Sequence, residues 1–191
     1  TFTWGLPFRF LYVSIVDVYK HQWQIASAIW RLRQKGFPVV VDFIGPANHK
    51  ALEFLKQVQK ELDPDNEFIF YKGPVPFEEL HSAYHDADAF VFGSSCENLP
   101  NILLEAMASS LAIASSDRGP MPEVLGDSGV YFDPENETSI VNSLERVIKN
   151  TSLRNQMAEG AFLRAKGFSW RQCADDTLSF IIETEKTNSI E

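Results

Sequence analysis

The stretch RFLYVSIVDVYKHQWQIASAIWRLRQKGFPVVVDFIG, residues 9–45, contains a complete strand–helix–strand pattern. The apolar run 9–15 predicts a strand, and residues 21–36 predict a helix, because their apolar positions recur every three or four residues and end at a glycine. Residues 38–45 are rich in β-branched side chains and predict a buried strand. Two strands joined by a helix of this length predict a right-handed unit of a parallel sheet.

The same alternation continues along the chain. Further strands are predicted at 67–71, 88–93, 111–115 and 129–133, and helices at 47–63, 77–87 and about 99–109, with one helical turn within 117–126. Three more helices, at 137–149, 152–166 and 170–185, close the chain. The predicted fold class is α/β: a doubly wound, Rossmann-like parallel sheet of about six strands with helices on both faces. Ligands of such folds bind beyond the carboxyl ends of the strands, at a topological switch point.

The chain length suits one domain. With 191 residues and no internal repeat or linker, we expect a single lobe over residues 9–186. Residues 1–8 are expected to be an interdomain linker or the start of the lobe, and residues 187–191 a frayed tail. The start at Thr1 suggests a fragment or a processed chain.

Composition excludes several classes of partner. The net charge of −9 argues against nucleic acid as the main partner and against membrane docking through this segment. No apolar run reaches the roughly 18–20 residues that span a bilayer. Cys96 and Cys173 form neither a disulfide framework nor a metal-binding spacing, so we expect free thiols in a reducing compartment.

The segment CENLPNILLEAMA, residues 96–108, carries two glutamates eight positions apart. Pro100 suits the first turn of a helix, so Glu97 is expected in the preceding loop, beside N–H groups of about residues 98–101 that favour an anion. Glu105 is expected within the helix, where a half-buried carboxylate suits a vicinal diol such as ribose. The alternative is a structural role for both residues: Glu97 only stabilises the N-terminus of the helix electrostatically, and Glu105 forms a surface ion pair.

A longer signature narrows these alternatives. Residues 97–134, ENLPNILLEAMASSLAIASSDRGPMPEVLGDSGVYFDP, resemble the C-terminal lobe of retaining, nucleotide-sugar-dependent glycosyltransferases of the GT-B fold, family 4. The E-x7-E motif of that family corresponds to Glu97 and Glu105. Residues 12–22, YVSIVDVYKHQ, resemble its first loop, Y-V-G-R-x4-K-G, and the similarity covers roughly residues 9–180.

The resemblance implies roles for individual residues. Lys20 and Glu97 would be the catalytic pair: Lys20 would neutralise the diphosphate, and Glu97 would contact the donor sugar. Glu105 would bind the ribose of the nucleotide. The remaining donor-binding candidates are Ser14, Tyr71, Lys72, Asn98, Leu99, Pro100 and Asn101. Plain turn chemistry for Tyr71 and Lys72, and a solvated helix-start role for Lys20, are the structural alternatives.

The sequence also departs from the family pattern. Ser14 and Ile15 replace a glycine and an arginine, so one expected cation is missing, and His21 replaces the glycine after the lysine. The usual E-G-F-G is shortened, so Asn98 must supply the close backbone approach of a glycine. Arg118 is either a substitute for the missing cation or a solvated loop residue.

These likenesses imply a function for the full-length protein. It would be a retaining hexosyltransferase that moves a sugar from a nucleoside diphosphate to a lipid-linked glycan acceptor in O-antigen or other polysaccharide biosynthesis. A UDP-linked donor is expected, possible examples being UDP-GalNAc or another N-acetylhexosamine. The N-terminal acceptor lobe is absent from this chain, which is therefore expected to bind donor and transfer little. The full-length protein is expected in the cytoplasm, peripheral to the inner face of the membrane.

The alternative function is a non-catalytic, Rossmann-like nucleotide-binding or interaction module, which the missing arginine favours. No metal or cofactor is expected in either case. Of the two Asp-x-Asp pairs, Asp63 and Asp65 precede a strand, whereas Asp86 and Asp88 end a helix, so neither has the placement of a metal-binding pair. The histidines lack zinc spacing, and glycine-rich dinucleotide or P-loop motifs are absent.

Overall fold

A computed structural model describes residues 2–188 of the chain. Its strands form one sheet in the order β3-β2-β1-β4-β5-β6, and all neighbours run parallel. The strands are β1 (Phe8–Val13), β2 (Val39–Ile44), β3 (Ile69–Gly73), β4 (Ala89–Phe92), β5 (Ala112–Ser116) and β6 (Val130–Phe132). The predicted fold class is therefore confirmed.

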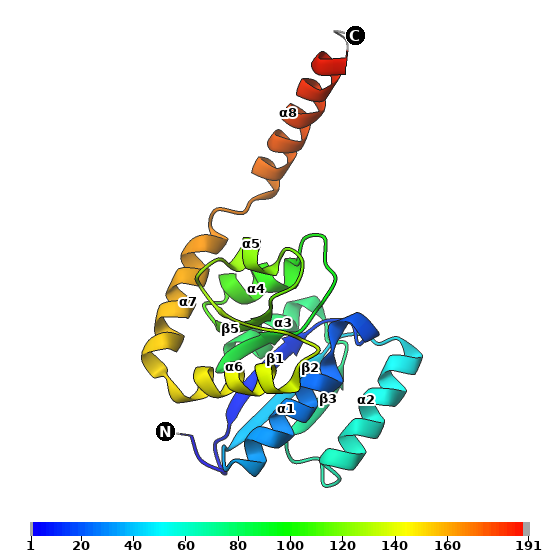
Figure 1. Cartoon of the computed structure of the whole chain (residues 1–191), viewed down its shortest axis with the longest axis vertical. Helices are drawn as coiled ribbons and strands as arrows, with labels where there is room; N and C mark the ends of the chain where they lie inside the picture. The colour runs from blue at the N-terminus through cyan, green and yellow to red at the C-terminus, as the bar shows by residue number, and fades with distance from the viewer. Residues whose placement is uncertain (1, 189–191) are drawn as a thin grey trace.

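The described residues contain nine helices. They are the 3₁₀ helix η1 (Val18–Lys20) and the α-helices α1 (Gln22–Gln34), α2 (His49–Leu62), α3 (Phe77–His85), α4 (Asn101–Ala108), α5 (Met121–Leu125), α6 (Glu137–Lys149), α7 (Thr151–Ala165) and α8 (Trp170–Asn188). Helix α1 packs against α2 and α6, whereas α4 packs against α5 and α7, so the sheet is covered on both faces (Figure 1).

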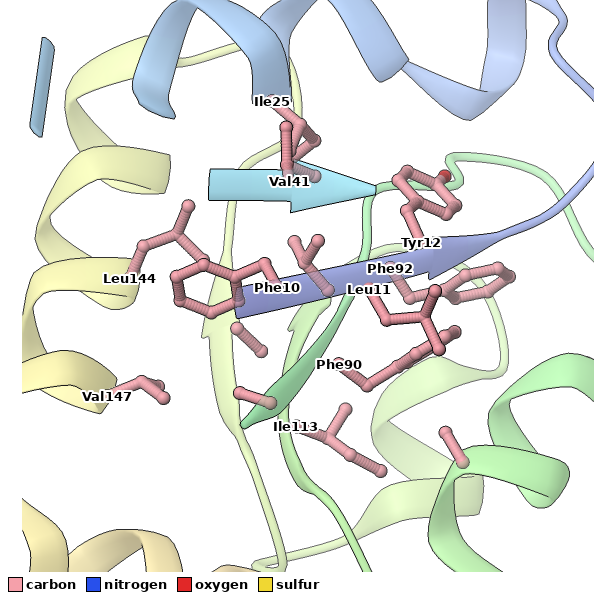
Figure 2. Packing of buried hydrophobic residues seen from close by; sticks show 14 of the residues in the cluster. Phe10, Leu11, Tyr12, Ile25, Val41, Phe90, Phe92, Ile113, Leu144 and Val147 are labelled. Carbon is pink, nitrogen blue, oxygen red and sulfur yellow. The ribbon is translucent and has the colours of Figure 1, made fainter. Parts of the chain in front are cut away.

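Strand β1 lies at the centre of the sheet and of the core. It pairs with β2 over six residues and with β4 at Phe10 and Leu11. Because helices cover both faces, the central strands are apolar at nearly every position rather than at alternate ones. Figure 2 shows part of this core, with side chains from β1, β2, β4 and β5 packed among those of α1 and α6.

Asp42 is the exception among the six residues of β2. Its carboxylate is buried, and its Oδ2 accepts from Arg9 Nη1 at 2.7 Å and from Lys72 Nζ at 2.8 Å, while Oδ1 has no partner. The two cations come from the neighbouring strands β1 and β3. They supply the pairing that a buried charge requires.

Several predicted boundaries differ from the structure. Helix α4 begins at Asn101 rather than at 99, because Pro100 has a ψ of 78° and is not helical. The turn η1 was not predicted, and α8 continues to Asn188 instead of ending at 185. The tail predicted as frayed thus begins inside the helix, and its residues 189–191 lie outside the described part. Both cysteines are free and exposed.

Helix α8 extends away from the rest of the chain (Figure 1). Trp170, at its start, is 76% exposed, and Trp4, near the other terminus, is 59% exposed, so neither packs in the core of this lobe. The most exposed large apolar residues in the middle of α8 are Leu178, Phe180 and Ile181. None of the helices in the described residues has the length and apolar character needed to cross a membrane.

Candidate functional site

The strand order creates a switch point between β1 and β4. The chain leaves β1 toward α1 and leaves β4 toward α4, and these helices cover opposite faces of the sheet. The loops after the two neighbouring strands therefore diverge at the carboxyl end of the sheet, which is where ligands of doubly wound folds bind. One loop leads to Lys20, and the other carries Glu97.

Lys20 and Glu97 meet at this switch point. The ammonium group of Lys20 donates to Glu97 Oε1, although the two residues are 77 positions apart in the sequence. Their side chains are only 7% and 15% exposed, so the pair is mostly shielded from water. Lys20 Nζ also lies 5.3 Å from the ring centroid of Phe92 and 4.9 Å from that of Tyr19, a distance suited to cation–π attraction. The structure thus brings together the two residues predicted to be catalytic.

Tyr12 connects the loops that hold this pair. Its buried hydroxyl donates to the Lys20 carbonyl at 2.5 Å and accepts from the Gly93 N–H at 3.1 Å. Burial is the main reason that the pKa of Tyr12 lies well above its usual value, so the hydroxyl remains a donor at neutral pH. A Cβ atom at Gly93 would lie 3.2 Å from the Lys20 carbonyl oxygen, a tight contact that favours glycine there.

Ser95 and His21 add a second connection between the same loops. The N–H of Ser95 donates to the Tyr19 carbonyl at 2.8 Å, and its hydroxyl donates to the same carbonyl at 3.2 Å. His21 Nε2 lies 3.0 Å from the Ser95 oxygen. Since the single proton of that hydroxyl is used, Nε2–H is the donor to Ser95, which leaves Nδ1 as an acceptor.

His21 is buried in an unusual backbone conformation. Its φ of 54° is left-handed, which explains why glycine suits this position in the family pattern. Nδ1 is buried without a partner. Burial lowers the pKa of His21, the negative charges of Glu135 and Asp133 raise it, and the charge of Arg118 lowers it. The imidazole is therefore neutral at pH 7.

Arg118, the candidate substitute for the cation missing at Ile15, is surrounded by carboxylates. Its Nη2 donates to Asp133 Oδ1 at 2.8 Å and lies 3.6 Å from Glu135 Oε2. Its Nε also lies 3.5 Å from Asp117. The guanidinium charge is thus balanced by neighbouring carboxylates in the free chain, as the Lys20 charge is by Glu97, so the substitution of Arg118 for the missing cation stays a prediction.

The start of α4 differs from the expected anion site. The N–H of Asn101 folds back to the Leu99 carbonyl at 2.9 Å, so it does not point freely out of the helix. Pro100 is buried, and its carbonyl accepts from the N–H groups of Leu103 and Leu104. Asn98 and Leu99 are exposed in the loop. The prediction that the N–H groups of about residues 98–101 point outward is therefore wrong at Asn101, and Pro100 has no N–H group to offer an anion.

Glu105 lines a hollow of about 450 Å³ between α4 and the start of α8. Leu99 and Asn101 line the same hollow, together with Leu104, Ala108, Ala165, Phe168, Ser169, Trp170 and Cys173. The other predicted site residues are not among its lining residues. The predicted site therefore has two parts: the Lys20–Glu97 pair at the switch point and the hollow beside Glu105, which the segment 97–105 connects.

Three predicted donor-binding residues have structural partners. The Ser14 N–H donates to the Ile44 carbonyl at 2.9 Å, and the Tyr71 hydroxyl donates to the Gly45 carbonyl at 3.0 Å. Lys72 forms its ion pair with Asp42. These contacts agree with the turn-chemistry alternative for Tyr71 and occupy the side chain of Lys72.

Sequence reasoning missed four residues near the predicted site. The first-loop motif includes Tyr12 without giving it a role, and no pattern points to Tyr84, whose hydroxyl donates to Glu105 Oε2 at 3.0 Å. Phe168 and Trp170 line the hollow. The segment FSW, residues 168–170, is the sequence signal for these last two residues, since it places two aromatic side chains at the junction of two predicted helices.

Two solved structures share this fold. The C-terminal domain of a glycosyl transferase group 1 family protein, LpcC, from Francisella tularensis superimposes with a TM-score of 0.74 at 23% identity, covering 84% of this chain and 86% of that one. A second structure, HepE from Anabaena in complex with UDP and glucose, gives a TM-score of 0.80 at 19% identity, covering 91% of this chain and 48% of that one.

Sequence comparison gives a relative and a family. The chain is 32% identical over 112 residues to the O-antigen chain mannosyltransferase B of Escherichia coli, which covers 59% of this chain and 29% of that protein. The chain spans about a third of the length of the curated relatives it matches. The profile of the family described as "Glycosyl transferases group 1" matches residues 6–164. Because that match includes all six strands and the loops with Lys20, Glu97 and Glu105, the chain belongs to the glycosyl transferases group 1 family.

Proposed function

We propose that this chain is the donor-binding part of a retaining hexosyltransferase that uses a UDP-linked sugar. The observation that carries the proposal is the shielded Lys20–Glu97 pair at the switch point between β1 and β4. A nucleoside-diphosphate sugar needs a cation for its diphosphate and acceptors for its sugar and ribose hydroxyls. Lys20, Glu97 and Glu105 supply these groups in that order.

Lys20 would act on the leaving group. When the bond between sugar and phosphate breaks, negative charge grows on the diphosphate, and a positioned ammonium group stabilises that charge. In the free chain Glu97 neutralises Lys20. On donor binding the ammonium group would turn to the phosphate oxygens, which would release Glu97 to accept from a sugar hydroxyl.

The wider activity of the full-length protein is part of the same proposal. An N-terminal lobe would bind a lipid-linked glycan acceptor at the inner face of the cytoplasmic membrane. The mannosyltransferase relative supports a role in O-antigen synthesis by its name, and the structure of HepE with UDP supports a uridine donor. UDP-GalNAc is the first sugar nucleotide to test.

We also propose that donor binding needs no divalent cation. Across residues 2–188, no three His, Cys, Asp or Glu side chains are grouped as metal ligands. The Asp63 carboxylate accepts hydrogen bonds from three backbone N–H groups, and Asp88 Oδ2 accepts one from the Arg9 N–H at 2.8 Å. Equal affinity for UDP with EDTA and with added Mg²⁺ is the expected result.

Calorimetry with UDP and uridine tests the assignment of the two parts of the site. Lys20→Met should weaken binding of UDP and leave binding of uridine unchanged, because uridine lacks the diphosphate. Glu105→Gln should weaken the binding of both ligands by about tenfold or more, since hydrogen bonds to a charged group contribute about 1.5–3 kcal/mol. GDP, ADP and the UDP-sugars complete the panel.

Matched variants control for loss of charge alone. Lys56→Met on α2 and Glu159→Gln on α7 remove the same charges at exposed positions and should leave every affinity unchanged. Absence of binding by UDP, GDP and ADP at millimolar concentration would contradict the proposal. Binding that Lys20→Met and Glu105→Gln leave intact would instead favour a nucleotide-binding module with a different site.

A further inference from the structure

Tyr84 and Glu105, which are 21 positions apart in the sequence, join helices α3 and α4. The hydroxyl of Tyr84, on α3, donates to Glu105 Oε2, on α4, at 3.0 Å. Tyr84 is 4% exposed, whereas Glu105 is partly exposed and lines the hollow at α4. Tyr84 does not line that hollow, so it contacts the carboxylate from the buried side.

The ring of Tyr84 is held in place by the core. Its centroid lies 5.9 Å from that of Phe90 on the central strand β4. Burial raises the pKa of Tyr84, and the charge and hydrogen bond of Glu105 raise it further, so the hydroxyl stays protonated at neutral pH. The group is therefore a fixed donor directed at one carboxylate oxygen.

A fixed donor restricts a flexible acceptor. A glutamate side chain has three rotatable bonds, and ordering them for a ligand has an entropic cost. Once Oε2 is held by Tyr84, the orientation of the carboxylate is set before any ligand arrives. Oε1 is then left for a ligand in the hollow, with the remaining lone pair of Oε2.

We propose that Tyr84 is a positioning residue for nucleotide binding: its hydroxyl orients the Glu105 carboxylate so that a ribose hydroxyl is recognised. This inference rests on the proposed function, in which Glu105 binds the ribose. It adds a residue outside the donor-binding motif, and it makes α3 part of the recognition of ribose. A merely structural Tyr84 would contribute to stability and not to discrimination between ribose and deoxyribose.

The test measures that discrimination by calorimetry. The ligands are UDP and its 2′-deoxy and 3′-deoxy forms, and the variants are Tyr84→Phe, Glu105→Gln and the double variant. Tyr84→Phe should weaken the binding of UDP by about three- to tenfold. It should also reduce the preference for UDP over a deoxy ligand, measured with whichever of the two deoxy forms binds more weakly to the wild-type chain. In the Glu105→Gln background the same change should have little further effect, because the two residues act as a unit.

A second tyrosine provides the control. The Tyr131 hydroxyl donates to the Gly126 carbonyl in a different loop, so Tyr131→Phe should lower stability without changing the UDP preference. If Tyr84→Phe does not fold, Glu105→Asp serves instead, because it keeps the charge but shortens the side chain away from Tyr84. Glu105→Asp should lose the preference in the same way.

The outcomes separate the two proposals. Suppose that Glu105→Gln abolishes the preference for UDP over the deoxy form. An unchanged preference in Tyr84→Phe, or in Glu105→Asp when that variant is needed, would then overturn the positioning role alone. A preference that also survives Glu105→Gln would overturn both the ribose role of Glu105 and the role of Tyr84. Failure of the wild-type chain to bind UDP, GDP and ADP would overturn the proposed function together with this inference.

Discussion

At the scale of single residues, Tyr12 shows how one buried hydroxyl organises the predicted catalytic pair. It contacts the backbone of Lys20 in one loop and of Gly93 in the other. Neither contact involves a charged side chain, yet together they fix the separation of the two loops. The position of the Lys20 ammonium group relative to Glu97 therefore depends on a residue inside the core of β1.

Replacing Tyr12 by phenylalanine tests this dependence. The change leaves a buried carbonyl and a buried N–H without their partner, so we expect a loss of about 1–3 kcal/mol in the free energy of unfolding. UDP affinity should fall as well, because one of the two connections between the loops is lost. Urea unfolding and calorimetry measure the two effects. Tyr131→Phe should lower stability and leave UDP affinity unchanged, and equal affinities in all three proteins would contradict the role of Tyr12 in the site.

His21 gives the folded chain a pH dependence with a definite sign. Its pKa is lowered on folding, mainly by burial, so the unfolded chain takes up the proton first as pH falls. Stability is therefore lost as pH falls through about 6.5, the ordinary histidine value, until the folded state is itself protonated.

The variant His21→Asn isolates this contribution. Asparagine tolerates the left-handed backbone at this position and does not titrate. The decrease in unfolding midpoint between pH 7.5 and 5.5 should be smaller in His21→Asn than in the wild-type chain. His49→Asn, at an exposed histidine, should retain the wild-type decrease. A decrease of the same size in all three proteins would show that His21 does not titrate as described.

At the scale of elements, the turn between α2 and β3 shows that a carboxylate in an apparent metal motif is structural. Asp63 is 2% exposed and accepts from the N–H groups of Glu67, Phe68 and Ile69 at 2.7–2.8 Å. These contacts end α2 and set the first residues of β3. The turn lies at the amino end of the sheet, opposite the predicted site.

Asp63→Ala should therefore destabilise the chain without affecting binding. Two buried N–H groups, those of Phe68 and Ile69, lose their acceptor, and we expect a loss of about 3 kcal/mol in the free energy of unfolding. Asp65→Ala changes the exposed aspartate of the same turn and should have little effect. Denaturant unfolding with and without UDP measures the stability and the UDP binding of the two variants. An altered UDP affinity in a folded Asp63→Ala protein would contradict a purely structural role for Asp63.

The strands could be predicted from sequence to within two residues at each end, because each is a short apolar run bounded by turn residues. The start of α4 could not, since the choice between 99 and 101 depends on whether the Asn101 N–H turns back to Leu99. Glu97 and Glu105 could be selected from their spacing together with the family pattern. Lys20 could also be selected from the family pattern, but its contact with Glu97 could not, and neither could Tyr84 as the partner of Glu105. No local periodicity encodes a contact across 77 or 21 residues.

At the scale of the whole molecule, α8 contributes little to the stability of the sheet. The side chains of residues 169–185 are all exposed, and α8 extends beyond the other helices (Figure 1). The start of α8 still matters for the predicted site, because Trp170 and Cys173 line the hollow with Glu105. Stability and site geometry are thus expected to respond differently to loss of this helix.

A chain that ends after Ser169 tests that separation. Its melting temperature should change by less than about 3 °C, which corresponds to about 1 kcal/mol for a protein of this size. UDP affinity should fall by a few-fold, because the hollow beside Glu105 loses one wall. Thermal melts monitored by circular dichroism and calorimetry provide the two readouts. A decrease in melting temperature of 10 °C or more, taken as about three times that limit, would show that α8 packs more closely than described.

The central position of β1 has a consequence for how the chain folds during synthesis. The β3-β2-β1 half of the sheet is complete in sequence by Gly73, but the other edge of β1 stays unpaired until Ala89–Phe92 have left the ribosome. Until then, the backbone groups of Phe10 and Leu11 that later face β4 are open to strands of other nascent chains. The time that the ribosome takes to translate the short stretch between β3 and β4 therefore sets how long this edge of β1 stays exposed.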